Sequence, residues 1–122
     1  MRTRDRGDKV ELFAESHLKK QGLQSVDKNF NSRYGEIDLI MLDKNTLVFV
    51  EVRFRANTSF GSGAETVTLR KQSKIIKTAQ LYLQANKKMQ QRDCRFDVVS
   101  VTLAAQEPII EWHQNAFQAS AW

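Results

Sequence analysis

The sequence predicts an α/β sandwich in which helices flank a central mixed sheet, and two observations carry this prediction. Apolar residues recur at helical spacing near the start of the chain and again within residues 68–86. Elsewhere the apolar residues gather in four short runs of the kind that form strands. The resulting order is helix, strand, strand, helix, strand, strand, which is typical of helices packed on a sheet.

The first helix is expected over residues 5–21, because its apolar side chains form one stripe and Gly22 is a suitable C-terminal stop. The stripe consists of Val10, Phe13, Ala14, His17 and Leu18. A polar connection is expected to follow, and its turn-forming residues include Asn29, Asn31, Ser32 and Gly35.

Two strands are expected at residues 37–42 and 47–52, joined by turn-forming residues 43–46. The second run is almost wholly apolar, which predicts a central strand buried on both faces. Residues 55–66 contain Gly61 and Gly63 among small polar residues, so a loop is expected there. A loop that closes over a substrate and an ordinary connection fit this composition equally well.

The second helix is expected over residues 68–86, with Thr68 as its N-cap. Its apolar stripe is expected to contain Leu69, Ile76, Ala79 and Leu83, with Ile75 and Tyr82 beside it. Strands are then expected at residues 95–103 and, more briefly, at 109–113. Residues 115–122 are expected to form a helical turn or a loose tail at the end of a single domain spanning residues 1–122.

Composition narrows the class of protein. A chain of 122 residues with 41% hydrophobic and 27% charged residues is long enough for one modest globular core. Cys94 is the only cysteine, which excludes an intramolecular disulfide framework and fits a reducing compartment. The start of the chain lacks the apolar stretch of a secretory signal, and no run is long enough to cross a bilayer. A cytoplasmic protein without a membrane partner is therefore expected.

The charge distribution favours an anionic partner. The formal net charge is +5, and residues 66–92 contain no acidic side chain. Within that segment Arg70, Lys74 and Lys77 recur at helical spacing, with Lys71 nearby, as they would along a phosphate backbone. The alternative is a solvated helix face that serves only solubility.

The predicted hairpin brings acidic residues together. If Asp43 pairs with Thr46, the same register places Asp38 opposite Glu51 and Glu36 opposite Arg53, all on one face. Two facing carboxylates repel, and a divalent cation such as Mg²⁺ or Mn²⁺ would relieve the repulsion.

Ordinary ion pairs are the alternative, with Glu36 neutralising Arg53 and Asp38 pairing with a nearby cation. The apolar context of Glu51 favours the metal site, because an unpaired charge there is costly. Glu11, at the edge of the first helix's stripe, is expected either as a third acid of this site or as a boundary surface residue.

These motifs resemble those of the YraN family of small bacterial proteins over most of the chain. The matching elements are Gly7-x-x-x-Glu11-x-x-Ala14, Asn29, Gly35-Glu-Ile-Asp-Leu-Ile40, Val48-Phe-Val-Glu-Val52, Arg55, Phe60-Gly61, Val67, Lys71 and Arg95-Phe-Asp-Val-Val99. The family is similar to Holliday-junction resolvases and to the restriction-endonuclease-like fold. The resemblance implies a catalytic Asp38, a metal-binding Glu51 and a helix acid at Glu11.

The chain differs from the family pattern at one position of this motif. The family's Glu-x-Lys element reads Glu51-Val52-Arg53 here, so arginine replaces the expected lysine. A lysine near metal and phosphate can orient water or lose a proton, whereas arginine stays charged but can still contact phosphate. The expected catalytic set is therefore Asp38, Glu51, Arg53 and Glu11, with Glu36 in support.

Three functions remain open. The first is a Mg²⁺- or Mn²⁺-dependent endonuclease acting on branched or single-stranded DNA. The second is a nucleic-acid-binding module without turnover, and the third is a protein-interaction scaffold of the same fold. DNA is favoured over RNA, and a homodimer is an open alternative to a monomer. The expected nucleic-acid contacts are Lys71, Arg70, Lys74, Lys77 and Arg55, with Lys71 ranked first because it matches a family position.

Overall fold

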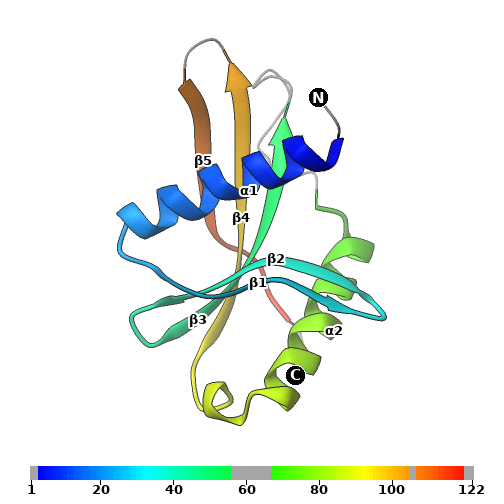
Figure 1. The fold of residues 1–122 in the computed structure, drawn as a ribbon. Helices are drawn as coiled ribbons and strands as arrows, with labels where there is room; N and C mark the ends of the chain where they lie inside the picture. The colour runs from blue at the N-terminus through cyan, green and yellow to red at the C-terminus, as the bar shows by residue number, and fades with distance from the viewer. Residues whose placement is uncertain (1–2, 56–66, 105–106, 120–122) are drawn as a thin grey trace.

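The computed structural model describes residues 3–55, 67–104 and 107–119 (Figure 1). The elements in chain order are α1 (Thr3–Lys20), β1 (Gln24–Ser32), β2 (Gly35–Asp43), β3 (Thr46–Arg55), α2 (Leu69–Ala85), a short 3₁₀ turn η2 (Lys87–Met89), β4 (Cys94–Ala104) and β5 (Glu107–Phe117). The loop expected around Gly61 and Gly63 and the end of the tail at Trp122 lie outside the described residues. Neither described helix has the length and apolarity that a bilayer span requires.

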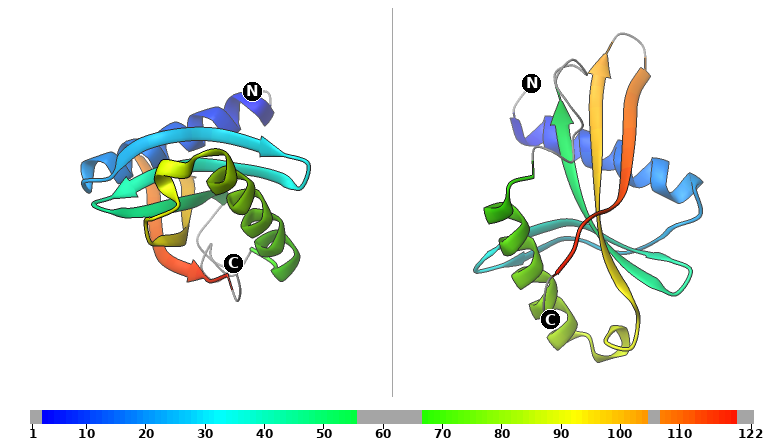
Figure 2. Two further views of the ribbon diagram at one scale, coloured as in Figure 1. Left: turned by 90° about the horizontal axis from the view of Figure 1, so that it is seen from below. Right: turned by 180° about the vertical axis from the view of Figure 1, so that it is seen from behind.

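The five strands form one mixed sheet in the order β1-β2-β3-β4-β5. Only β3 and β4 run parallel, and α2 lies between them in the chain as the crossover. The other neighbouring strands are antiparallel. The helices α1 and α2 lie on opposite faces of the sheet, as both views in Figure 2 show. The predicted α/β sandwich is confirmed, and the arrangement is consistent with a restriction-endonuclease-like fold.

Each face of the sheet carries its own hydrophobic core. On the α2 face, Phe49 stacks on Phe96 at 5.4 Å between ring centroids, and Phe96 stacks on Phe117 at 5.0 Å. On the α1 face, the helix residues Val10, Ala14 and Leu18 pack against β2, β3 and β4. Burial on both faces confirms that β3 is the central strand expected from its apolar run.

The hairpin register is confirmed from Asp43 opposite Thr46 to Leu39 opposite Val50. Thr68 caps α2 as expected, and its side chain accepts a hydrogen bond from the Lys71 backbone N–H at 3.2 Å. At the end of α1 the chain turns through Gly22 with φ +102°, a conformation that favours glycine.

The polar connection expected after α1 is wrong, because residues 24–32 form the edge strand β1. Only Val26, Phe30 and Ser32 of this strand are partly buried, so the alternation that marks a strand is weak. A register shift between Ser25 and Asp27 and the positive φ of Asn29 interrupt it further.

The buried face of α2 is rotated about the helix axis relative to the apolar stripe expected from the sequence. Leu69 is 82% exposed, whereas Ile75, Thr78, Ala79 and Tyr82 are the buried residues. Thr78 tolerates burial because its hydroxyl bonds the Lys74 carbonyl and the Ser32 hydroxyl, both at 2.8 Å. A hydroxyl with both of these partners therefore occupies the buried face of α2, where the apolar spacing did not include Thr78.

The last strand is longer than the expected 109–113. Residues 115–117 continue β5, so the helical turn or loose tail expected there is wrong for these residues. Asn115 has φ +52° beside a register shift between Phe96 and Val98, which hides the continuation in the sequence. Phe117 then returns to the core.

Asp97 of β4 is hydrogen-bonded to β5. The residue is fully buried, and its carboxylate accepts hydrogen bonds from the Trp112 indole and the Asn115 backbone N–H, both at 2.9 Å. It also forms an ion pair with Arg95 at 3.0 Å. These contacts give Asp97 a structural role between the last two strands.

Replacing Asp97 with alanine is expected to lower the free energy of unfolding by about 3 kcal/mol, because three donors lose a buried acceptor. Urea denaturation measures the change, and Asp93→Ala at an exposed position is the matched control. A loss as small as that of the control would contradict the assignment.

Candidate functional site

The acidic site lies where β2 and β3 separate. Their paired register ends with Leu39 opposite Val50, so Asp38 and Glu51 lie just beyond the ladder. There the Asp38 Oδ2 accepts a hydrogen bond from the Val52 backbone N–H at 2.8 Å. This bond satisfies a backbone donor that has lost its strand partner. The predicted strand pairing extended one pair too far, because Asp38 and Glu51 are not paired in the ladder. Their side chains are nevertheless in contact.

The carboxyl groups of Asp38 and Glu51 share a hydrogen bond. Burial raises the pKa of Asp38 to about 9, and the hydrogen bond with Glu51 and its charge act in the same direction. The Val52 N–H opposes this shift but does not reverse it. These effects favour the protonated form of Asp38, and a proton between the two carboxyl groups relieves their repulsion.

Two cations border the same pair. The Lys71 ammonium lies 2.9 Å from Glu51 Oε2, and the Arg53 guanidinium lies 3.9 Å from the same oxygen. Glu51 is 4% exposed, whereas the Lys71 side chain is 45% exposed, so the acid is fixed inside while the lysine reaches in from the rim. Lys71 was expected on a nucleic-acid-binding surface, and its contact with Glu51 was not foreseen.

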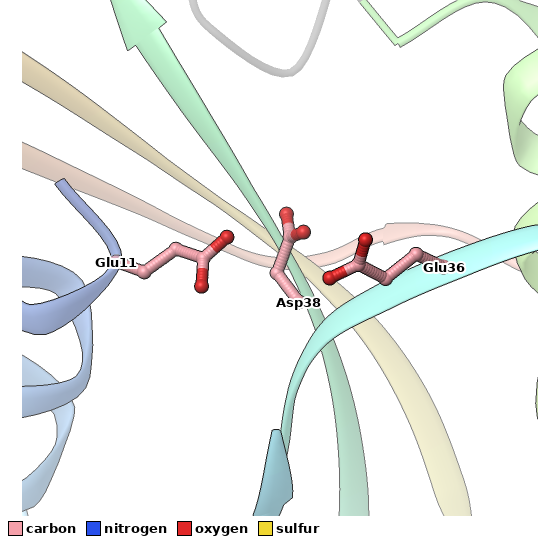
Figure 3. Close-up of side chains that lie close together, drawn as sticks. All are labelled: Glu11, Glu36 and Asp38. Atoms are coloured by element: carbon pink, nitrogen blue, oxygen red, sulfur yellow. The ribbon is translucent and has the colours of Figure 1, made fainter. Parts of the chain in front are cut away.

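A second group of acids adjoins Asp38. Carboxylate oxygens of Glu11, Glu36 and Asp38 lie within 4.8 Å of one another, from α1 and β2 (Figure 3). The Asn29 side-chain amide donates to Glu11 at 2.9 Å and to Glu36 at 2.6 Å. Burial raises the pKa of Glu11, and the hydrogen bond from Asn29 partly offsets that shift. Asn29 had no expected role, and its only signal in the sequence was its place among the family motifs.

Glu36 does not face Arg53 as expected. Its partner across the ladder is Asn31 of β1, and its carboxylate is held by Asn29. The separation of β2 from β3 ends the pairing before the register reaches this position. Glu36 nevertheless stays in the acidic group and is exposed.

The site residues line one pocket with a volume of about 290 Å³. Its polar lining comes from Glu11, Asp38, Glu51, Arg53 and Lys71. The donor set fits a hard divalent cation, because carboxylate oxygens are the ligands that Mg²⁺ and Mn²⁺ prefer. Such an ion could be held by Asp38 together with Glu51, which it contacts, or with Glu11 and Glu36, whose carboxylate oxygens lie within 4.8 Å of it.

The expected nucleic-acid contacts divide into two groups. Arg70, Lys74 and Lys77 are exposed along α2, on the helix that carries Lys71 into the pocket. Arg55 is buried at the end of β3 and lies 3.9 Å from Glu111 of β5, apart from the exposed cations of α2, and its contact with nucleic acid stays a prediction. Burial could not be read from the sequence, because a strand-end arginine has the same pattern whether it is exposed or paired.

The turn between β1 and β2 adds one cation, Arg33, and one aromatic residue, Tyr34, that the sequence did not single out. The Arg33 guanidinium lies 5.0 Å and the Lys77 ammonium 5.4 Å from the centroid of the Tyr34 ring. The turn therefore joins the basic face of α2 through an aromatic side chain.

Comparison with known proteins gives a consistent result. A family model described as "Uncharacterised protein family UPF0102" matches residues 10–101, which include every residue of the acidic pair and Lys71. A UPF0102 protein of Stutzerimonas stutzeri is 46% identical over 113 residues, covering 93% of this chain and 94% of the relative. UPF0102 proteins of Saccharophagus degradans and Vibrio cholerae are 50% and 47% identical over 91% and 93% of this chain, with the same shares of their own lengths. The chain belongs to the UPF0102 family, which is the YraN family that its motifs resemble.

Proposed function

We propose that this protein is a divalent-metal-dependent phosphodiesterase that cleaves nucleic acid, with branched or single-stranded DNA as its favoured substrate. The observation that carries the proposal is the meeting of Asp38 and Glu51 in a pocket that also holds Lys71 and Arg53. Acids that can bind a hard cation and bases that can bind phosphate thus line one small cavity.

The proton on Asp38 supports a cation site. Two acids in contact inside a protein need a positive charge between them, and at neutral pH a proton supplies it. A divalent ion supplies the same compensation with more charge, and binding it would release that proton. Once bound, such an ion would polarise a phosphodiester and lower the pKa of a water molecule.

The residues of the chain have separable tasks in this proposal. Asp38 and Glu51 hold the ion, and the Val52 N–H fixes the orientation of Asp38. Glu11 adds a third carboxylate from α1, with Asn29 holding its direction. Arg53 stays charged at neutral pH, so it binds phosphate rather than accepting a proton.

Substrate preference is proposed from the surface beside the pocket. The exposed bases of α2 lie on the same helix as Lys71, so a phosphate backbone following them leads into the acidic site. Tyr34, between Arg33 and Lys77, adds an aromatic ring of the kind that contacts unpaired bases. The cations serve a duplex and a single strand alike, so the ring is the feature that favours a single strand or a branch.

A second candidate is a nucleic-acid-binding module without turnover. Its supporting observation is that Lys71 and Arg53 already neutralise Glu51. Binding requires only the basic surface, whereas cleavage also requires the ion to enter.

A cleavage assay with Mg²⁺ or Mn²⁺ on flap, junction and single-stranded DNA is expected to give product. Replacing Asp38 with alanine should reduce the rate at least about 100-fold through loss of a metal ligand. Asp93→Ala, far from the pocket, is the matched control. Product that persists in Asp38→Ala would rule out this site, and salt-sensitive binding without product would favour the binding module.

Added Mn²⁺ is expected to raise the melting temperature, since binding only to the folded state stabilises it by about 2.7 kcal/mol at 100 times Kd. Calorimetric melting of the wild type, Asp38→Ala and Glu51→Ala tests this. Each variant should lose the increase, whereas the Asp93→Ala control should keep it. An increase that survives in both variants would place the ion elsewhere.

Metal-free stability is expected to fall as pH rises from about 4 to about 9. In this window the folded chain keeps the Asp38 proton that the unfolded chain releases, because folding raises the pKa of Asp38 to about 9. The slope is at most about 1.4 kcal/mol per pH unit, the limit for one proton.

Asp38→Asn mimics the protonated acid, so its stability relative to the wild type should grow with pH. Urea denaturation in EDTA at pH 5 and pH 8.5 measures the difference. Parallel pH curves for the two proteins would show that Asp38 is ionised in the folded state.

A further inference from the structure

We propose that the Lys71 ammonium acts as the resident counterion of Glu51 in the metal-free protein and moves to substrate phosphate when a divalent ion enters. Metal binding and nucleic-acid binding are then coupled through this one side chain. The inference rests on the proposed function, because it uses the same metal site.

The first step of the argument is the need for a counterion. Glu51 lies between Val50 and Val52 in the central strand, and it is 4% exposed. A carboxylate in such surroundings is costly unless a cation is close. Lys71 is nearer than Arg53, at 2.9 Å against 3.9 Å from the same oxygen.

The second step is competition for that oxygen. A divalent ion bound to Glu51 Oε2 would lie about 2.1 Å from it, and the ammonium lies 2.9 Å from it. The two positive charges would then be close neighbours and repel each other strongly. An ion entering between Asp38 and Glu51 therefore favours the departure of Lys71.

The third step is the place to which Lys71 can move. Its backbone is fixed in the first turn of α2 by the Thr68 cap, but its side chain is 45% exposed and flexible. Arg70 and Lys74 flank it on the exposed part of the helix. A phosphate drawn to the pocket by the ion and by Arg53 is within the range of the released ammonium.

Reciprocity follows from these steps. If the ion frees Lys71 for phosphate, then bound phosphate must strengthen ion binding by the same factor. Lys71 also supplies the ammonium that the Glu51-Val52-Arg53 element lacks, from a helix rather than from the neighbouring strand position.

The experiment measures coupling rather than turnover. Calorimetry measures the Kd of the full chain for Mn²⁺ in the absence of DNA. Fluorescence anisotropy measures the Kd for a single-stranded DNA oligonucleotide, first in EDTA and then in Ca²⁺. In the wild type, Ca²⁺ is expected to tighten DNA binding at least about 5-fold. In Lys71→Met, Mn²⁺ alone should bind at least about 5-fold more tightly, and Ca²⁺ should tighten DNA binding by a smaller factor than in the wild type, because only the direct attraction between ion and phosphate remains.

Two control variants separate this role from general electrostatics and from misfolding. Lys74→Met removes the same charge from the same helix at a position that does not line the pocket, so the Ca²⁺ effect should remain. Lys71→Arg keeps a cation at the rim, so its Mn²⁺ affinity should stay near that of the wild type.

The outcomes distinguish the inference from the proposed function. Mn²⁺ binding that depends on Asp38 but is equal in the wild type and Lys71→Met would overturn the inference alone. Equal loss of the Ca²⁺ effect in Lys71→Met and Lys74→Met would also overturn it. A wild type that binds no Mn²⁺ would overturn both.

Discussion

The carboxylate of Glu51 is a charge inside the central strand of the sheet, and the surrounding site is organised around it. The group is 4% exposed and meets solvent only through the small pocket that it lines, so its charge needs partners within the protein. The charge of Glu51 is compensated by a hydrogen bond with Asp38 and by the nearby cations of Arg53 and Lys71. These contacts bring together β2, β3 and α2, so the placement of α2 and the chemistry of the pocket depend on the same charge.

Room for this arrangement comes from the separation of β2 and β3. Had the ladder continued, the two acids would have stood across a closed pair of strands with no cavity between them. Instead the pairing stops at Leu39 and Val50, and the Val52 N–H turns to the Asp38 carboxylate. The cavity, the orientation of the acid and the satisfaction of a backbone donor therefore share one cause.

The cations of the sheet and those of α2 have different surroundings, which indicates a structural role for the first group and a binding role for the second. Arg95 and Arg55 are cations of the sheet: Arg95 pairs with Asp97 on its own strand, and Arg55 of β3 lies 3.9 Å from Glu111 of β5, on the far side of β4. The cations of α2 are exposed, and one of them, Lys71, also reaches Glu51. This helix, which carries no acidic residue, therefore presents positive charge next to the acids proposed to hold metal, which is the arrangement that attracts a polyanion to a cation site.

The sequence by itself determined the helices, the central strand and the hairpin register from Asp43 to Leu39, because these follow from local periodicity and turn chemistry. It also brought Asp38 near Glu51, although the ladder ends one pair before them. It missed β1 and the end of β5, where bulges and polar residues erase the two-residue alternation. It also placed Arg55 on the surface and Lys71 on a generic basic face. Only the tertiary structure decided those positions, because a long cationic side chain takes its role from the acid that packing brings near it, and that acid can be distant in the chain.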